Sequence, residues 1–293
     1  MRKSVLIAIN LLFSALALTA QEDLLSLLNE EEETEYVSAS FKTNRVINLQ
    51  SLENTAPGVL DIKIGHRFGF INQGAYELFG LDNATIRIGA DLGLTNRLMV
   101  GFGRSSFEKT YDGFLKYRLI RQSTGKRKMP FSVSAMASTA IRSEKPRDPD
   151  RENYFSSRMF YTFQLILGSK ISEGFSIQVS PTLVHRNLVS TLEEENDVIA
   201  IAAAARQKLT KRLSLNVEYI YVLPDQILDS NENSLSIGFD IETGGHVFQL
   251  HFTNSTSMID KGFVAETTGN WLDGDIHFGF NISRVFTLWG REE

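Results

Sequence analysis

Residues 275–287 read D-I-H-F-G-F-N-I-S-R-V-F-T, and the fold depends on how this stretch is oriented. From Ile276 to Ile282 every second residue is large and apolar, and the residues between them are polar or glycine. This alternation predicts a β-strand with one apolar face and one polar face. In a water-soluble barrel the apolar face points inward, whereas in a transmembrane barrel it points outward into lipid.

The same period of two residues recurs from about residue 59 to the C-terminus. Residues 197–209 are the exception, because they are rich in alanine, which has a low strand propensity and would also suit a helix. The strands on either side favour a strand there too. We predict about twelve strands, at 59–68, 84–94, 97–105, 110–121, 131–142, 158–170, 174–187, 197–209, 211–223, 233–243, 246–254 and 275–287.

The connections between these strands alternate in length. Short turns on one rim and long loops on the other are typical of transmembrane β-barrels, whose short turns face the periplasm. Residues 122–130 depart from the rule, because a short turn is expected there. The short turns are at 95–96, 171–174, 208–211 and 244–245, and the long loops are at 69–83, 143–157, 188–196, 224–232 and 255–274.

The polar faces of the strands carry too many charges for the core of a soluble protein. Burying an unpaired charge costs several kcal/mol or more, and the predicted strands would bury about eleven. The strands are also about as long as a tilted membrane strand needs to be. The competing interpretation is a secreted soluble barrel or sandwich whose charged face meets water. We predict an all-β fold, a single antiparallel transmembrane β-barrel of about 12 strands with its apolar face toward lipid.

The N-terminus has the features of a secretory signal peptide. A basic start is followed by an apolar run from Val5 to Leu18 and by small residues, which predicts cleavage after Ala20 or after Ala17. A membrane anchor is the alternative, but the run is short for one. We therefore predict a signal peptide at 1–20, an acidic periplasmic segment at 21–58 and a barrel domain at 59–293, in the outer membrane of a Gram-negative cell.

The segment before the first predicted strand has two parts. The acidic run at 30–33 is typical of a solvated tail, or of a small helix that binds a periplasmic protein. Residues 36–52 lack a regular period, and they would either plug the lumen or add a strand. A periplasmic partner is expected to act through residues 21–52.

Five stretches of the chain resemble a family of outer-membrane β-barrel proteins that is classed as a domain of unknown function. The resemblance runs from about Tyr36 to Leu288. It implies the barrel fold and the envelope location, and it brings no established activity, substrate or catalytic residues. The stretches are R-L-M-V-G-F-G-R-S-S (97–106), K-T-Y-D-G-F-L-K-Y-R (109–118), Q-S-T-G-K-R (122–127), P-T-L-V-H-R-N (181–187) and F-D-I-E-T-G-G-H-V-F-Q-L-H-F-T-N-S-T (239–256).

Mixed charges are predicted to line the lumen. They either pair across neighbouring strands and fill a closed interior, or line a narrow path that selects a small polar solute. A twelve-stranded barrel lies between filled small barrels and open porins, so its size does not decide between the two. The candidate lumen-lining residues are Asp61, Lys63, Arg67, Arg87, Asp91, Asp112, Lys116, Arg118, Arg186, Glu218, Asp240, Glu242, His251 and His277.

Other kinds of site have weaker support in the sequence. His251, Asn254 and Ser255 supply the residue types of a lipolytic enzyme, but His251 is expected to face the lumen rather than the outer wall where lipid lies. The five histidines are scattered without ligand spacing, and the chain has no cysteine, so neither a metal nor a cofactor is predicted. A net charge of −5 gives no basic footprint for nucleic acid.

The leading hypothesis from the sequence is a narrow channel or uptake barrel for small polar solutes. The second is a non-conducting barrel that binds a ligand or a periplasmic partner, and the third is an outer-membrane lipolytic enzyme. Outer-membrane lipid is expected to cover the apolar face. The barrel assembly machinery is expected to recognise the terminal strand, where Phe286 is the aromatic residue near its end.

Overall fold

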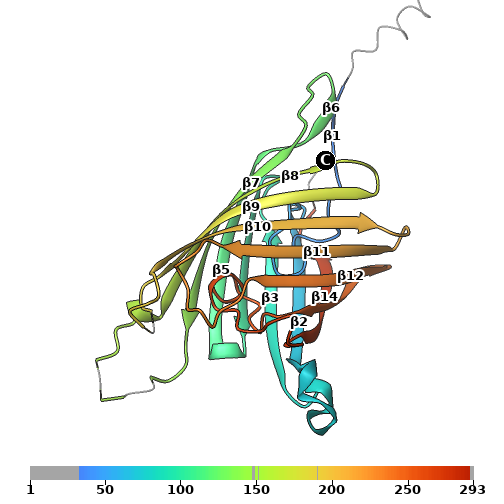
Figure 1. Ribbon diagram of the computed structural model, residues 1–293. Helices are drawn as coiled ribbons and strands as arrows, with labels where there is room; N and C mark the ends of the chain where they lie inside the picture. Colours follow the sequence, from blue (N-terminus) through green and yellow to red (C-terminus); the bar gives the residue numbers. More distant parts are fainter. Residues whose placement is uncertain (1–32, 147–148, 151, 190, 291–293) are drawn as a thin grey trace, which may run out of the picture.

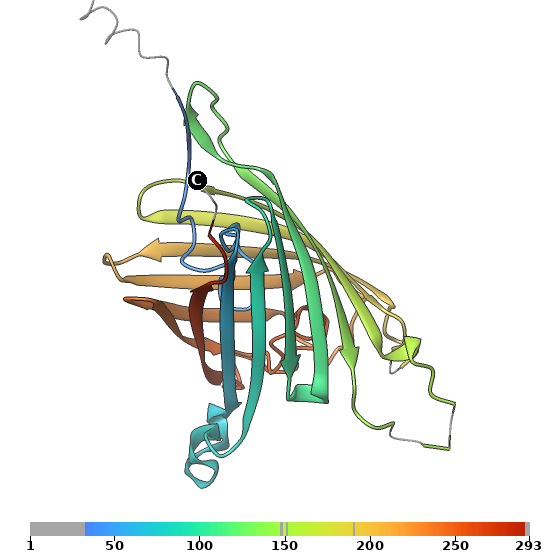
Figure 2. The same ribbon diagram turned by 180° about the vertical axis from the view of Figure 1, so that it is seen from behind.

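The computed structural model describes residues 33–146, 149–150, 152–189 and 191–290. The predicted signal peptide at 1–20 and the leucine-rich and acidic residues 21–32 lie outside the described residues. Within the described part, twelve strands close into one antiparallel barrel in which β14 pairs with β2 (Figures 1 and 2). The predicted fold class is therefore confirmed.

The twelve barrel strands agree closely with those expected from the alternating pattern. The alanine-rich stretch is a strand, as predicted. In chain order the barrel strands are β2 (Val59–Phe70), β3 (Ala84–Gly93), β4 (Leu98–Ser105), β5 (Thr110–Ile120), β7 (Ser132–Arg142), β8 (Met159–Lys170), β9 (Phe175–Arg186), β10 (Asp197–Lys208), β11 (Leu213–Val222), β12 (Ser234–Thr243), β13 (His246–Thr253) and β14 (His277–Thr287).

A small sheet outside the barrel explains why residues 122–130 are not a short turn. Strand β1 (Thr34–Tyr36) pairs with β6 (Ser123–Gly125), and both project beyond the rim that carries the short turns (Figure 1). The longer connections at the opposite rim contain the short helices η1 (Ile71–Gln73), η2 (Ala75–Gly80), η3 (Phe107–Lys109), η4 (Ser156–Arg158) and α2 (Asp260–Ala265). No helix among the described residues is long and apolar enough to cross a membrane.

Strand β14 has its apolar face on the outside. Phe278, Phe280 and Ile282 are partly exposed on the outer wall, whereas His277 and Gly279 are buried inside. On the paired strand β13 the same division holds, because Phe248, Leu250 and Phe252 are exposed. The apolar residues of these strands thus cover the outer surface, as expected for a wall that faces lipid.

Two segments enter the lumen from opposite rims. Residues 39–55, here the N-terminal insert, enter from the short-turn rim and contain a continuous buried run from Val46 to Leu52. Residues 254–267, here the loop insert, form the first part of the β13–β14 connection and carry α2, all six residues of which are buried. The barrel interior is therefore occupied from both ends.

The inserts pack against one side of the barrel. Phe41, Leu49 and Leu52 of the N-terminal insert and Phe263 of the loop insert belong to one hydrophobic cluster with the inner face of β8–β11. The wall residues in this cluster are Ile166, Val184, Val198, Ala200, Ala202, Ala204, Ile220 and Val222. The alanines of β10 are small where the inserts pass, so the alanine-rich strand makes room for them.

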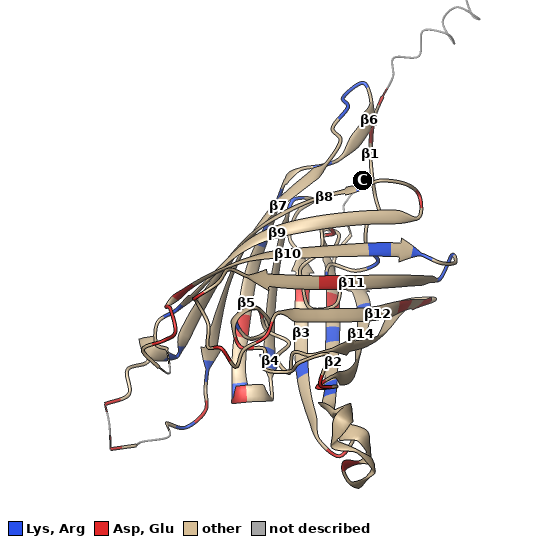
Figure 3. Ribbon diagram, viewed as in Figure 1, with Lys and Arg blue, Asp and Glu red and all other residues tan. Residues whose placement is uncertain are grey.

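The remaining strands carry most of the buried charge. Figure 3 shows basic and acidic residues along β2, β3, β5, β11 and β12, while β8 and β9 are tan for most of their length. The inner face of β8–β10 thus carries few charges, and most of the buried charge lies on β2–β5 and β11–β14, here the charged wall. The candidate functional site lies on the charged wall.

Candidate functional site

One buried carboxylate holds the N-terminal insert. Glu218 projects from β11 into the lumen and is 1% exposed. Its oxygens accept backbone N–H bonds from Ile47 at 3.1 Å, from Asn48 at 2.9 Å and from Leu49 at 3.1 Å. Three successive N–H groups turned toward one carboxylate solvate its charge in place of water. Glu218 therefore fixes the middle of the insert.

Cationic side chains hold the two ends of the same insert. Lys116 of β5 is fully buried and donates to the carbonyls of Ser51 at 3.1 Å and Glu53 at 2.6 Å. Arg206 of β10 donates to the carbonyls of Ala39 and Ser40, both at 3.1 Å. The insert is thus attached to the barrel wall mainly by charged groups that bond its backbone.

Arg67 joins the two inserts to each other. Its guanidinium donates to the carbonyls of Ser255 and Ser257 in the loop insert and to the Asn48 Oδ1 atom in the N-terminal insert, each at 2.6 Å. The side chain is 1% exposed and belongs to β2. One wall residue therefore contacts both segments that fill the lumen.

An ionic cluster fastens the loop insert to the rim with long loops. Lys261 of α2 is 2% exposed and pairs with Glu108 at 2.5 Å and with Glu266 at 2.7 Å. Arg142 at the end of β7 pairs with Glu108 at 3.3 Å, and the Lys261 Nζ atom lies 4.4 Å from the centre of the Phe160 ring. These contacts hold α2 against β7, β8 and the β4–β5 connection.

The pKa values of the two carboxyls in this cluster, Glu108 and Glu266, are shifted in opposite directions. Burial raises the pKa of Glu108, but the attraction of Lys261 and Arg142 outweighs burial and lowers that pKa below its ordinary value of 4.5. Burial raises the pKa of Glu266, and repulsion from Glu108 adds to the rise while Lys261 opposes it. Acidification therefore protonates Glu266 before Glu108.

We expect the loop insert to respond to pH in two phases. As the pH falls toward 4.5, protonation of Glu266 relieves the cost of its buried charge, so protection of α2 from hydrogen exchange should rise slightly. As the pH falls further, through the lowered pKa of Glu108, the Lys261 and Arg142 pairs are lost, and protection should fall by about threefold or more. Hydrogen exchange of residues 259–266 between about pH 7 and about pH 3.5, corrected for the intrinsic rate, measures this.

Two variants check the assignment of the acidic phase. Glu108→Gln should abolish it, because glutamine does not titrate. Glu173→Gln should leave it unchanged, because the Glu173 side chain is 93% exposed at the opposite rim. Persistence of the acidic phase in Glu108→Gln would contradict its assignment to this ionic cluster.

The charged wall is internally paired. Lys63 pairs with Asp61 on the same strand and lies 4.0 Å from Asp91 on β3. Arg87 of β3 pairs with Asp112 of β5, across the intervening strand β4. A side chain at Gly103 of β4 would collide with Arg87, so that glycine leaves the space through which the pair forms.

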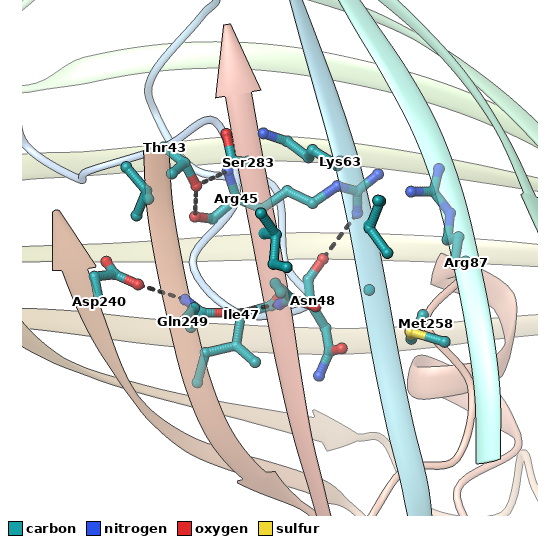
Figure 4. Close-up of a pocket in the computed structure, with 15 residues that line it drawn as sticks. Thr43, Arg45, Ile47, Asn48, Lys63, Arg87, Asp240, Gln249, Met258 and Ser283 are labelled. Atoms are coloured by element: carbon teal, nitrogen blue, oxygen red, sulfur yellow. Dashed lines mark hydrogen bonds between the residues drawn. The ribbon is translucent and has the colours of Figure 1, made fainter. Parts of the chain in front are cut away.

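A cavity of about 50 Å³ remains between the N-terminal insert and this wall (Figure 4). Arg45 and Asn48 of the insert face it, and Met258 of the loop insert closes it toward the long-loop rim. The wall residues around it are Lys63, Ile64, Gly65, Arg87, Asp240, Val247, Gln249, Asn281, Ile282 and Ser283. Its lining combines cations, one carboxylate and amides, which suits a small polar guest.

A larger vestibule leads toward this cavity from the short-turn rim. It has a volume of about 540 Å³ and shares Thr43, Val247 and Ser283 with the lining of the cavity. Asp61 and Glu242 contribute carboxylates to it. Vestibule and cavity follow the same side of the lumen, along β2, β13 and β14, and Met258 and Arg67 lie beyond them.

Most of the candidate lumen-lining residues are buried inside the barrel. Arg118 is half-buried at the short-turn rim, where its guanidinium donates to the carbonyl of Asn96 at 3.5 Å and to that of Leu52 in the N-terminal insert at 3.4 Å. Glu242 is 47% exposed at the same rim and pairs with Lys42 of the N-terminal insert. The candidates that are buried are Asp61, Lys63, Arg67, Arg87, Asp91, Asp112, Lys116, Arg186, Glu218, Asp240, His251 and His277.

Arg186, His277 and His251 are among the buried candidates that do not line the cavity. Arg186 pairs with Glu194 at 2.6 Å near the long-loop rim. His277 bonds the Phe68 carbonyl at 2.7 Å and the Thr256 hydroxyl at 2.9 Å. His251 fits beside Gly279, where an added Cβ would lie only 2.5 Å from its Nε2 atom.

The residue types of a lipolytic enzyme do not assemble into a catalytic arrangement in the described part of the chain. Neither ring nitrogen of His251 has a hydrogen-bond partner there, and the Ser255 hydroxyl donates to the Ser257 carbonyl at 3.4 Å. Asn254 donates to the carbonyls of Asn233 and Gly269. A serine nucleophile needs a base within hydrogen-bond reach. Among the described residues there is also no cluster of three or more potential metal ligands.

Sequence reasoning missed the contribution of the loop insert. Met258, Lys261 and Phe263 lie in a connection expected to be a long loop, and all three are buried. The stretch M-I-D-K-G-F-V-A at 258–265 is unusually apolar for an exposed loop, and that composition could have signalled a segment folded into the lumen. The amides Asn48, Gln249 and Asn281 had no comparable signal.

Comparisons with known proteins agree with a membrane barrel. The chain is similar to the solved structure of the NanC porin, with 10% identity and a TM-score of 0.48 over 78% of this chain and 98% of that one. It is similar to Omp33 of Acinetobacter baumannii, with 11% identity and a TM-score of 0.42 over 81% of this chain and 100% of that one. It is also similar to an outer-membrane channel of Pseudomonas putida F1, with 12% identity and a TM-score of 0.42 over 80% of this chain and 97% of that one. A search of the curated proteins finds no match. The family model described as a membrane-bound β-barrel domain (DUF5777) matches residues 41–286. The chain belongs to this family of membrane-bound β-barrel domains, and the family resemblance inferred from its motifs is confirmed.

Proposed function

We propose that this protein is an outer-membrane channel for small polar solutes, in which the loop insert narrows the lumen and the N-terminal insert is a removable plug. The observation that carries the proposal is the charged wall with its cavity and vestibule, along which the N-terminal insert is held by polar anchors. The predicted signal peptide and the barrel together support the outer membrane of a Gram-negative cell.

The chemistry of the anchors favours a plug that can leave. A permanent filler is most stable when it packs apolar groups, because buried charges cost solvation energy. Glu218, Lys116 and Arg67 instead bond the inserts through charged groups. When an insert withdraws, water can enter the lumen and solvate these groups, so no charge is left buried without a partner.

The second candidate is a non-conducting barrel that binds a ligand or a partner. The hydrophobic cluster favours it, because Phe41, Leu49 and Phe263 bury apolar surface against the β8–β11 wall. Withdrawal of the N-terminal insert would expose part of this surface to water at a cost of roughly 1.5–3 kcal/mol for each large side chain. The two candidates therefore differ in whether the N-terminal insert ever leaves.

A periplasmic partner would act on the part of the chain outside the lumen. Residues 33–39 are mostly exposed, whereas residues 46–52 are buried. A partner that grips the exposed part would transmit force directly to the insert. Outer-membrane lipid would cover the apolar outer wall. The barrel assembly machinery would meet Phe286, which is 41% exposed on β14.

Conductance in planar bilayers separates the two candidates. The full mature chain should pass little current, and a variant that lacks residues 21–55 should conduct through a water-filled lumen. Heat-modifiable gel migration first shows that the variant has folded as a barrel. Absence of current from the folded deletion variant would refute the channel and leave the non-conducting barrel.

A further inference from the structure

A second hollow lies on the short-turn rim beside the β1–β6 sheet, and four arginines line it. Arg97 comes from the β3–β4 turn, Arg118 from the end of β5, Arg121 from the residue after that strand, and Arg127 from the hairpin that follows β6. The hollow has a volume of about 70 Å³, and among the described residues no acidic side chain lines it. We propose that it binds the phosphate group of an anionic phospholipid.

The arginines are not neutralised by partners in the described part of the chain. None of the four has a carboxylate within 4.0 Å there. Arg118 and Arg121 lie near enough to repel each other, and Glu53 of the N-terminal insert attracts Arg118 only from beyond ion-pair distance. Like charges gathered without a counter-charge favour an anion bound from outside.

The backbone around the hollow is firmly held. The N–H of Arg118 donates to the carbonyl of Arg97 at 2.8 Å, which fixes two of the arginines side by side. The hydroxyl of Ser123 donates to the carbonyl of Arg127 at 2.6 Å. Arg121 lies over the ring of Tyr36 with its guanidinium carbon 4.3 Å from the ring centre. The backbone that carries these arginines and the guanidinium of Arg121 are therefore positioned by the fold before any ligand arrives, which lowers the cost of binding.

The surroundings of the hollow favour a lipid headgroup over free phosphate. Leu119 lines it and continues the exposed apolar row of Leu115 and Tyr117 on the outer face of β5. Met129 contributes a second apolar side chain to the lining. The site thus joins the apolar wall to a cluster of guanidiniums, which form bidentate bonds with phosphate. A phospholipid matches both parts of the site, because its acyl chains can lie along the apolar wall while its phosphate contacts the arginines.

The double variant Arg97→Gln/Arg127→Gln tests the proposal, because both residues are exposed and lie outside the barrel strands. Binding of phosphatidylglycerol to the folded, detergent-solubilised full chain is counted by native mass spectrometry, with phosphatidylcholine as the neutral comparison. The parent should prefer phosphatidylglycerol, and the double variant should bind it about tenfold more weakly or worse. The matched control Lys211→Gln/Arg212→Gln removes the same charge from another turn of the same rim and should change binding by less than about twofold.

A second arm uses inorganic phosphate as the probe. Saturable phosphate binding that the double variant loses, without phosphatidylglycerol binding, would keep the arginine site but overturn the lipid as its ligand. An equal loss of phosphatidylglycerol binding in Arg97→Gln/Arg127→Gln and in the control Lys211→Gln/Arg212→Gln would overturn the site, because general surface charge would then account for the binding. Binding of neither probe by the parent would overturn it as well.

Discussion

Replacing Glu218 with glutamine should release the N-terminal insert and increase the time-averaged current through the barrel by about 100-fold. The carboxylate accepts the N–H groups of Ile47, Asn48 and Leu49, and glutamine offers a single acceptor oxygen and an amide that repels N–H donors. Loss of charge-assisted bonds to a buried group costs on the order of 3 kcal/mol here, which is about a 100-fold change in the released population.

Two measurements detect the release of the N-terminal insert. Planar-bilayer recordings report the current, and trypsin reports exposure of the insert through cleavage after Arg45. The matched control is Asp61→Asn, which changes a lumen carboxylate whose bonded partners, Lys63 and Ser283, belong to the wall. The control should behave like the parent. Unchanged current and unchanged cleavage in Glu218→Gln would contradict the role of Glu218 as the anchor.

Replacing Arg67 with methionine should loosen both inserts at once. Methionine keeps much of the side-chain volume but removes the donors to Ser255, Ser257 and Asn48, which lie on two different inserts. Each buried acceptor that loses its donor costs about 1–3 kcal/mol unless water reaches it. Protection from hydrogen exchange should therefore fall by at least about tenfold in residues 44–52 and also in residues 254–265.

Which inserts lose protection from hydrogen exchange distinguishes Arg67 from the other anchors. Glu218→Gln should lower protection in residues 44–52 far more than in α2, because Glu218 bonds only the N-terminal insert directly. Arg186→Met is the control for loss of a buried arginine, since Arg186 is 2% exposed and bonds Glu194 and the Glu195 carbonyl. Loss of protection confined to one insert in Arg67→Met would mean that the two inserts are not coupled through this residue.

The barrel itself could be predicted from the sequence because its signal is local and repeated. Each strand carries the period of two on its own, as Phe278, Phe280 and Ile282 do on β14. The charges then decide which face of each strand points to lipid, since residues such as Lys63 and Arg87 cannot lie unpaired in an apolar core. Even the alanine-rich stretch could be assigned to a strand from the strands on either side.

The contents of the lumen could not be predicted in the same way. The pairing of Arg87 with Asp112 skips a strand and depends on the space left by Gly103, which is visible only in three dimensions. The N-terminal insert has no regular period because it lacks regular structure of its own, and Glu218 anchors it from 169 residues away in sequence. Arg118 bonds the carbonyl of Leu52 in the N-terminal insert from the short-turn rim, a contact that alternation does not reveal.

The position of the two inserts along the chain also has a consequence for biogenesis. The N-terminal insert leads through residues 56–58 into β2, and the loop insert leads through residues 268–276 into β14, so each precedes one of the two strands that pair at the seam. Both segments can occupy the nascent interior while that seam is still open. Zipping β14 to β2 then encloses them, and neither has to be threaded through a finished pore.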